Sequence, residues 1–212
     1  MTPIHHHITP DVLDAWRAGT LAHPFAVVVA THLSICDECR AAEDSRALLG
    51  GALLNSAEGA ELRPEARSRI MAALDDPAMR PGPPARGSGA FPAPVMAELR
   101  GQPPRWRMLG GGIRQQILSA DSEGSLRLLY IPPGKAVPEH GHRGMELTLV
   151  LQGSFSDSEG TFRRGDVETA QDEIDHQPVA GPGLPCICLA ATDAPLRFHS
   201  FVPRLLQPLF RI

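Results

Sequence analysis

The chain has 212 residues, of which 42% are hydrophobic, and a formal net charge of −4. This length accommodates one large domain or two small ones, and the weakly acidic balance excludes the basic footprint of a nucleic-acid-binding protein. No apolar run approaches the roughly 20 residues of a membrane span, and the N-terminal stretch "MTPIHHHITPDVLD" lacks the apolar segment of a signal peptide. We therefore expect a cytoplasmic protein that binds neither nucleic acid nor membrane directly.

Residues 1–75 have the pattern of a small all-α domain. Thr9 is suited to cap a first helix, with Pro10 at the first helical position and Gly19 as the stop signal. Three further helices are expected at about residues 24–35, 36–54 and 64–76. A helical domain of this size has a marginal core, and small domains often bind a metal to compensate.

The next segment, residues 76–95, has the composition of a linker. The stretch from Asp75 to Pro94, "DDPAMRPGPPARGSGAFPAP", contains six prolines and three glycines and has no usable periodicity. Such a composition is typical of an extended or flexible tether.

Residues 96–212 change to a strand pattern. The short segments "SLRLLYIPPG", "MELTLVLQGSF", "DVETA" and "PCICLAA" are rich in apolar and β-branched residues and are separated by Gly, Pro and Asp. This spacing favours an all-β sandwich or barrel. The whole chain is thus predicted to be an α+β multidomain protein, with the helical domain first.

The stretch "THLSICDECR" carries the first candidate site, formed by His32, Cys36 and Cys39. A C-x-x-C pair alone suits either a redox couple or a metal site. His32 and Cys36 are one helical turn apart and Cys39 follows at a helix-neighbour interval, so the three side chains can converge. Zinc prefers four such ligands, whereas a redox pair requires a βαβ setting that these helical segments do not provide.

The fourth zinc ligand is expected among three consecutive histidines near the N-terminus: His5, His6 and His7. The stretch "HLSICDEC" also resembles the H-x3-C-x2-C signature of zinc-binding anti-sigma domains, which sequester sigma factors of the extracytoplasmic-function group. In that family the fourth ligand is a histidine just before the first helix. The shared "AGTL" stretch implies that His7 occupies this position.

The second candidate site lies in "GKAVPEHGHRGMELTLVLQG". The spacing Gly134, His140, His142, Glu146, Gly153 matches the complete first cupin motif. His140 and His142 share one face of a strand and Glu146 keeps the same parity, so three ligands are expected to point into a barrel.

The second cupin motif is partly matched. Gly165 and His176 have its spacing of eleven residues, but Gln171, Glu173 and Ala180 replace its proline, glycine and asparagine. The resemblance implies His176 as a fourth ligand, because the departures touch the turn and the tail of the motif. Three histidines and a carboxylate suit Zn, Mn, Fe or Ni, and the sequence does not select one.

Two further cysteines, Cys186 and Cys188, would lie on one face of a strand. Free cysteine is commonly buried, so core packing is the favoured interpretation, with redox sensing as the alternative. Positions i and i+2 on a strand are about 6.6 Å apart, which is poorly suited to a direct disulfide.

A zinc anti-sigma domain, a tether and a metal-binding cupin together resemble the ChrR-type cupin anti-sigma factors over essentially the whole chain. The matching stretches include "VVATHLS", "WRMLGGGIRQ" and "CICLAATDAPLRF". The resemblance implies a regulator without enzymatic activity that binds one extracytoplasmic-function-type sigma factor. It also implies that the cupin senses singlet oxygen or related oxidative stress and triggers release.

Two alternatives remain open from the residues themselves. One is a metal-dependent cupin enzyme, a dioxygenase or isomerase, with a zinc-binding docking domain. The other is a redox-regulated zinc protein without a sigma partner. The identity of the cupin metal, the signal chemistry and the arrangement of the two domains are not determined by the sequence.

Overall fold

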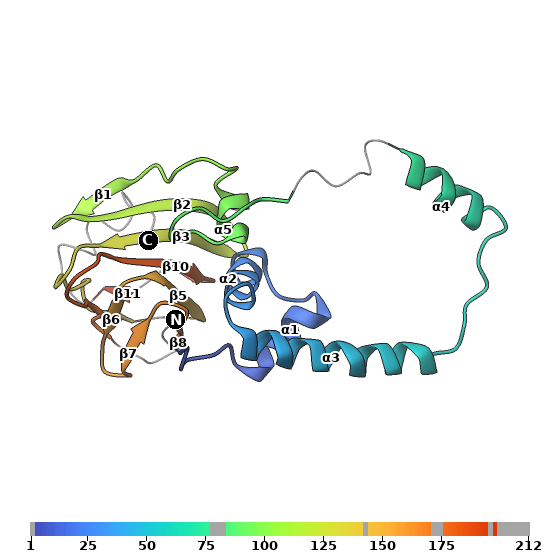
Figure 1. The fold of residues 1–212 in the computed structure, drawn as a ribbon, viewed down its shortest axis with the longest axis horizontal. Coiled ribbons are helices and arrows are strands. Elements are labelled where there is room, and N and C mark those ends of the chain that lie inside the picture. The colour runs from blue at the N-terminus through green and yellow to red at the C-terminus, as the bar shows by residue number, and fades with distance from the viewer. Residues whose placement is uncertain (1–2, 77–83, 142–143, 171–175, 195–196, 199–212) are drawn as a thin grey trace.

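The computed structural model describes residues 3–76, 84–141, 144–170, 176–194 and 197–198, with the helices first and the strands after them (Figure 1). The helices are α1 (Pro10–Ala18), α2 (His23–Leu33), α3 (Asp37–Ser56), α4 (Ala66–Asp75) and α5 (Ala93–Glu98). The strands are β1 (Arg107–Gly110), β2 (Ile113–Asp121), β3 (Gly124–Ile131), β4 (His140–Gly141), β5 (Glu146–Gln152), β6 (Ser154–Ser156), β7 (Thr161–Arg163), β8 (Val167–Ala170), β9 (Val179–Ala180), β10 (Cys186–Thr192) and β11 (Arg197–Phe198).

Helix α1 has the boundaries that its sequence predicts. Thr9 occupies the N-cap position with extended backbone, Pro10 opens the helix, and Gly19 ends it in the left-handed conformation with φ of 68°. Glycine adopts this conformation without the steric penalty that other residues incur. At α3 the cap is a cysteine, because Cys36 Sγ accepts a hydrogen bond from the Cys39 amide at 3.5 Å.

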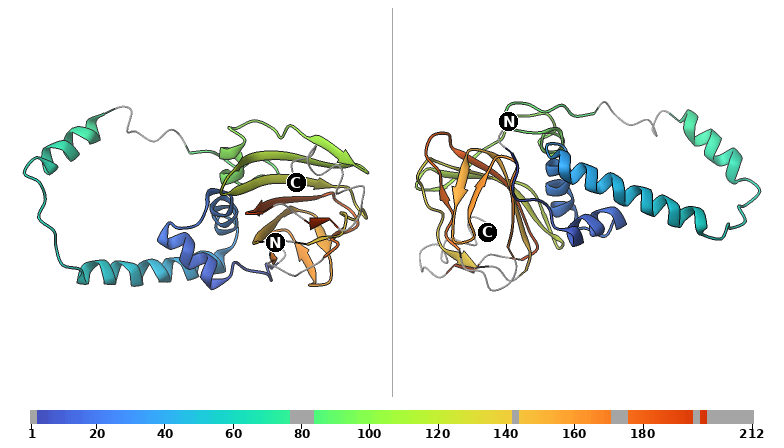
Figure 2. Two further views of the ribbon diagram at one scale, coloured as in Figure 1. Left: turned by 180° about the vertical axis from the view of Figure 1, so that it is seen from behind. Right: turned by 60° about the horizontal axis from the view of Figure 1, so that its bottom comes forward.

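The strands form three antiparallel sheets that curve around a common interior (Figure 2). The largest sheet has the order β1-β2-β3-β10-β5-β8, and the smaller ones are β7-β6-β9 and β11-β4. The expected "SLRLLYIPPG", "MELTLVLQGSF", "DVETA" and "PCICLAA" segments supply β3, β5 with β6, β8 and β10. The predicted fold class, a small helical part followed by an all-β barrel, is confirmed.

In the six-stranded sheet, the central strands β5 and β10 are buried on both faces, which explains their high apolar content. One face points into the barrel, where a cluster contains Val150, Phe155 and Phe162. The opposite face lies beneath α2, and its leucines belong to the same hydrophobic core as the helices. Members of that core include Val28 and Val29 of α2, Val95 of α5, Leu126 and Leu128 of β3, Leu147 and Leu149 of β5, and Leu189 of β10. The helical part and the barrel therefore share one core.

Helix α5 lies partly inside the segment whose composition predicts a linker. It begins at Ala93 and buries Val95 and Met96 against the shared core. Two apolar side chains are enough to fix a single helical turn next to α2, although the proline-rich composition around them has no periodicity. Among the described residues, no helix is both long enough and apolar enough to cross a membrane.

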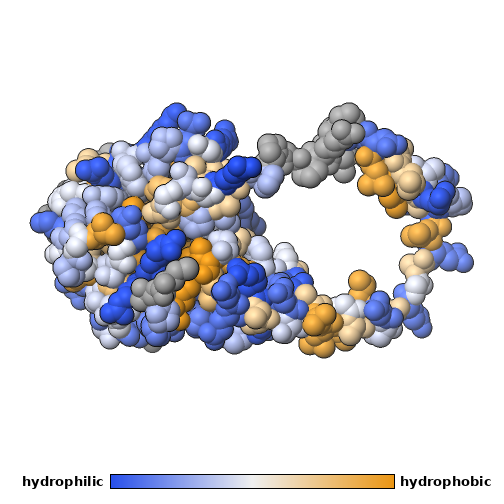
Figure 3. Space-filling model, viewed as in Figure 1, coloured by the Kyte–Doolittle hydropathy of each residue, from blue (hydrophilic) through white to orange (hydrophobic). Residues whose placement is uncertain are grey.

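Helices α3 and α4 expose an unusual amount of apolar surface. Only Cys39 of α3 is buried, and α4 buries none of its residues. Figure 3 shows apolar side chains along the outer half of α3 and on α4, where both helices extend away from the barrel. The exposed side chains, here termed the α3–α4 apolar surface, are Leu48, Leu49, Leu53, Leu54, Leu62, Ile70, Met71 and Leu74.

Candidate metal centres

The first candidate centre lies where the N-terminal segment meets the end of α2 and the start of α3. The structure brings together His7, His32, Cys36 and Cys39, and one ligand atom from each lies within 4.8 Å of the others. His32 lies in the last turn of α2, while the two cysteines occupy the N-cap and first turn of α3. The turn between the helices therefore converges three of the four side chains, as the spacing predicts.

The distances in this cluster suit a tetrahedral ion. His7 Nδ1 lies 3.4 Å from Cys36 Sγ and 3.5 Å from Cys39 Sγ. Ligands at ordinary Zn–N and Zn–S bond lengths stand about 3.6 Å apart in a tetrahedron. On its other side, His7 Nε2 lies 3.4 Å from the Glu38 carboxylate, an outer contact of the kind that orients a histidine ligand.

His32 is fully buried and has one unpaired ring nitrogen. Its Nδ1 lies 2.9 Å from the main-chain carbonyl oxygen of Gly165. A carbonyl only accepts, so Nδ1 carries the proton and Nε2 keeps its lone pair. Among the described residues, Nε2 has no hydrogen-bond partner. Burial also lowers the pKa of His32 to about 4, which keeps the ring in the neutral form that binds metals.

The two other N-terminal histidines do not join the cluster. The main-chain amides of His5 and His6 both donate to Asp166 Oδ1, at 2.7 and 3.0 Å. The His6 ring packs on Phe162, with ring centroids 4.4 Å apart. His7 is thus the member of the histidine triplet that the structure places at the cysteines.

The residues of the first centre fit a zinc ion in two respects. The buried, unpaired nitrogen of His32 has a lone pair that only a proton or a metal would use. Burial raises the pKa of the Cys39 thiol to about 11, and a divalent cation would offset the cost of a buried thiolate. A closed set of two histidines and two cysteines is typical of structural zinc.

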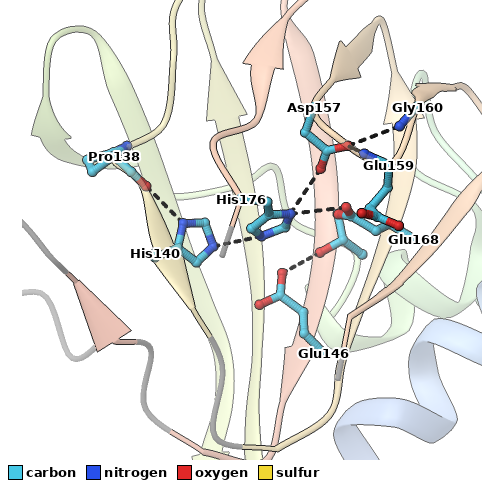
Figure 4. Close-up of polar contacts among 9 residues, drawn as sticks. Pro138, His140, Glu146, Asp157, Glu159, Gly160, Glu168 and His176 are labelled. Carbon is cyan, nitrogen blue, oxygen red and sulfur yellow. Dashed lines mark hydrogen bonds and ion pairs between the residues drawn. The ribbon is translucent and has the colours of Figure 1, made fainter. Parts of the chain in front are cut away.

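The second candidate centre lies inside the barrel (Figure 4). His140 comes from β4, Glu146 from the start of β5, and His176 from the segment before β9; all three are buried. His140 and Glu146 thus lie on different strands, although their parity suggests one strand. His142, the fourth predicted ligand, lies outside the described residues.

Main-chain pairing holds the two barrel histidines next to each other, with their rings inclined at 61°. The His140 amide donates to the His176 carbonyl at 3.2 Å, and the His176 amide donates back at 3.0 Å. His140 Nδ1 donates to the Pro138 carbonyl oxygen at 2.8 Å, so its Nε2 keeps a lone pair. The two Nε2 atoms are 3.1 Å apart. A proton or a metal ion must lie between them, and about 3.0–3.4 Å is the spacing of two nitrogens on one metal.

Two carboxylates behind His176 were not predicted from the sequence. His176 Nδ1 lies 2.9 Å from Asp157 Oδ2 and 3.1 Å from Glu168 Oε1. Asp157, Glu168 and His176 also form a second group whose spacing could hold an ion. Carboxylates on the far nitrogen of a histidine ligand orient the ring and raise its basicity.

Burial and hydrogen bonding shift the pKa values of Glu168 and His176 in this group. Burial raises the pKa of Glu168 to about 7. Burial lowers the pKa of His176, but hydrogen bonding to Glu168 and the surrounding carboxylates outweigh it, and the result is about 9. The barrel interior therefore has excess negative charge around His176, which favours a cation.

The cysteines of β10 are both buried in the barrel core, in agreement with the favoured interpretation. Cys186 Sγ and Cys188 Sγ lie 3.5 Å apart, and the structure has them as free thiols. Hydrogen bonding to Cys186 and burial raise the pKa of Cys188 well above its usual range. A thiol held in the protonated form is a weak nucleophile.

Comparisons with known proteins agree along the chain. The family model of the ChrR cupin-like domain matches residues 99–194. The anti-sigma-E factor ChrR of Cereibacter sphaeroides is 52% identical over 211 residues, which cover 99% of each chain. The crystal structure of Rhodobacter sphaeroides SigE in complex with the anti-sigma ChrR matches with a TM-score of 0.80 and 48% identity. That match covers 90% of the present chain and 100% of the solved one.

Proposed function

The chain belongs to the ChrR family of anti-sigma factors, and from this premise we propose that it binds an extracytoplasmic-function-type sigma factor in a one-to-one complex. Bound in this way, the sigma factor is withheld from core RNA polymerase. Family membership favours this regulatory role over the cupin dioxygenase or isomerase that the barrel motif alone leaves open.

The observation that carries the proposal is the α3–α4 apolar surface. Leu49 and Leu53 lie one helical turn apart on α3, and each is 64% exposed. Leucine side chains exposed to this extent do not stabilise the fold of the chain itself. Clusters of exposed apolar side chains on helices that leave the body of a protein are typical of an interface whose partner is absent. The sigma factor is the partner that the family provides.

This surface can be tested with one double variant and one matched control. Leu49→Asp/Leu53→Asp should weaken sigma binding by about 1,000-fold, since each of the two buried interface leucines replaced by a charge costs about 2 kcal/mol. Leu184→Asp changes an equally exposed leucine on the β9–β10 connection and should leave binding unchanged. Equal binding by both variants would exclude the α3–α4 apolar surface as the interface.

We further propose that zinc occupies the first centre, held by His7, His32, Cys36 and Cys39, and that it folds the helical part into its binding-competent form. Structural zinc contributes folding free energy directly when the ligands come from separate short segments. The four residues come from the N-terminal segment, α2 and α3. Without the ion, these separate segments would be held together only by packing against the shared core.

For the barrel, we propose a divalent ion such as Zn, Mn, Fe or Ni, bound by His140, His142, Glu146 and His176. The Nε2 atoms of His140 and His176, which face each other across 3.1 Å, support this assignment. The family resemblance assigns to this barrel the sensing of singlet oxygen or related oxidants, followed by release of the sigma factor. Asp157 and Glu168 would hold the His176 ring in register with the ion.

A further inference from the structure

The β7–β8 turn of the barrel contacts residues at the first metal centre that are far away in the sequence. The turn, residues 163–167, connects two strands of the barrel, yet it contacts the segment that carries His7 and the helix that carries His32. We infer that this turn positions the ligands of the N-terminal metal site, so that the barrel sets how firmly that site holds its ion. The inference rests on the proposed zinc site and adds to it a control by the second domain.

The first contact fixes His32. The carbonyl oxygen of Gly165 accepts from His32 Nδ1 at 2.9 Å, across 133 residues of sequence. This bond selects the tautomer whose Nε2 faces the cysteines, and it also fixes the plane of the ring. The Gly165 oxygen belongs to the main chain, and the His32 ring is held in place by burial, because it is 0% exposed.

The second contact fixes the segment before His7. Asp166, which is 1% exposed, accepts from the amides of His5 and His6 through Oδ1 and from the Arg163 amide through Oδ2. The Val167 amide in turn donates to the His6 carbonyl oxygen at 3.0 Å. His7 is the next residue, so its backbone starts from an anchored position.

The third contact is steric and requires glycine at position 165. A Cβ on Gly165 would lie 2.6 Å from Ile4 Cδ1 and Cγ1, which is closer than such atoms approach one another. Ile4 and Gly165 therefore pack directly, and a side chain at position 165 would require the outer atoms of the Ile4 side chain to move. Gly165 also has φ of +98°, so part of the need for glycine is conformational.

The turn is continuous with the barrel site. Strand β8 starts at Val167, and the next residue, Glu168, hydrogen-bonds His176 at 3.1 Å. Three consecutive residues, from Asp166 to Glu168, thus contact the N-terminal segment at one end and a barrel ligand at the other. A shift of β8 caused by a change at His176 would reach His7 and His32 without passing through the proline-rich linker.

The experiment compares variants of two glycines that have nearly the same φ. Gly183 has φ of +97° and nothing within 4 Å of its added Cβ, so Gly183→Ala matches Gly165→Ala in the unfavourable φ without the steric contact. The probe is Co²⁺ added to the full apo chain, followed by the thiolate-to-cobalt absorption band. This band reports only on a cysteine-containing site, and Cys36→Ser/Cys39→Ser, which should abolish it, assigns it to the first centre.

We expect Gly165→Ala to weaken Co²⁺ binding at this band by about 10- to 100-fold relative to Gly183→Ala, the range found when outer contacts of metal ligands are removed. In an Ile4→Ala background the same substitution should have a smaller effect, because the atoms that clash are gone. The inference would be overturned if the two glycine variants bound Co²⁺ equally well, or if Gly165→Ala had the same effect in the wild-type and Ile4→Ala backgrounds. Either result would leave the proposed zinc site intact. A wild-type chain without the thiolate band would overturn the zinc site and the inference together.

Discussion

Glu146 and Leu147 are consecutive residues of β5 that face opposite environments. Glu146 points into the barrel, where it lies with His140 and His176 (Figure 4), whereas Leu147 is fully buried in the core beneath α2. Alternation along a strand produces this division at every step of β5. The sheet that carries Glu146 on one face thus supports the helical part on the other.

This shared core predicts that the helical part and the barrel unfold together. The chain has two tryptophans, Trp16 in α1 and Trp106 before β1, so Trp106→Phe and Trp16→Phe variants each leave a reporter in one part. Both reporters should give the same thermal midpoint. Leu189→Ala, which removes a fully buried side chain of β10, should lower stability by about 2–5 kcal/mol and shift both reporters equally. A shift confined to Trp106 would show two independent units.

Replacing His32 should abolish the first metal centre. His32→Ala removes a predicted zinc ligand and a fully buried side chain, so we expect loss of zinc, loss of helical circular dichroism and no sigma binding. His23→Ala is the matched control, because His23 lies on the same helix, is exposed, and within the described part of the chain forms a surface ion pair with Glu98. Metal content and sigma binding of His23→Ala should equal those of the wild type. A folded, sigma-binding His32→Ala protein would contradict the zinc assignment.

Replacing a barrel ligand should have a different effect. Glu146→Ala should remove the barrel metal and weaken the response to oxidant, while the complex with the sigma factor still forms, because the α3–α4 apolar surface lies far from the barrel interior (Figures 1 and 3). Glu139→Ala changes an exposed carboxylate next to His140 and serves as the control. Metal analysis of the purified complexes separates the two variants. Failure of Glu146→Ala to bind the sigma factor would exclude this division of roles.

Much of this arrangement was predictable from local patterns. The caps Thr9 and Gly19 define α1, and the spacing of His32, Cys36 and Cys39 places three side chains at one helix junction. The strands of the barrel follow from their apolar segments and turn residues. Each of these features depends on residues close together in sequence, where helical and strand periodicity are reliable guides.

The rest depends on contacts between distant segments. Asp157 lies in a Ser/Asp/Gly-rich turn and Glu168 is one acidic residue in a short strand, so neither stands out until the fold brings both to His176. The only available signal is the inward parity of Glu168 in "DVETA". The docking of Ile4 on Gly165, and the choice of His7 by geometry, require a contact across about 160 residues that no periodicity encodes.

The most direct test of the account is co-purification of the full chain with the extracytoplasmic-function-type sigma factor encoded beside its gene, with the metal content of the complex measured in parallel. We predict a one-to-one complex that contains zinc and that dissociates when a chelator removes it. A chain that keeps metal in its barrel yet binds no sigma factor would contradict the central claim.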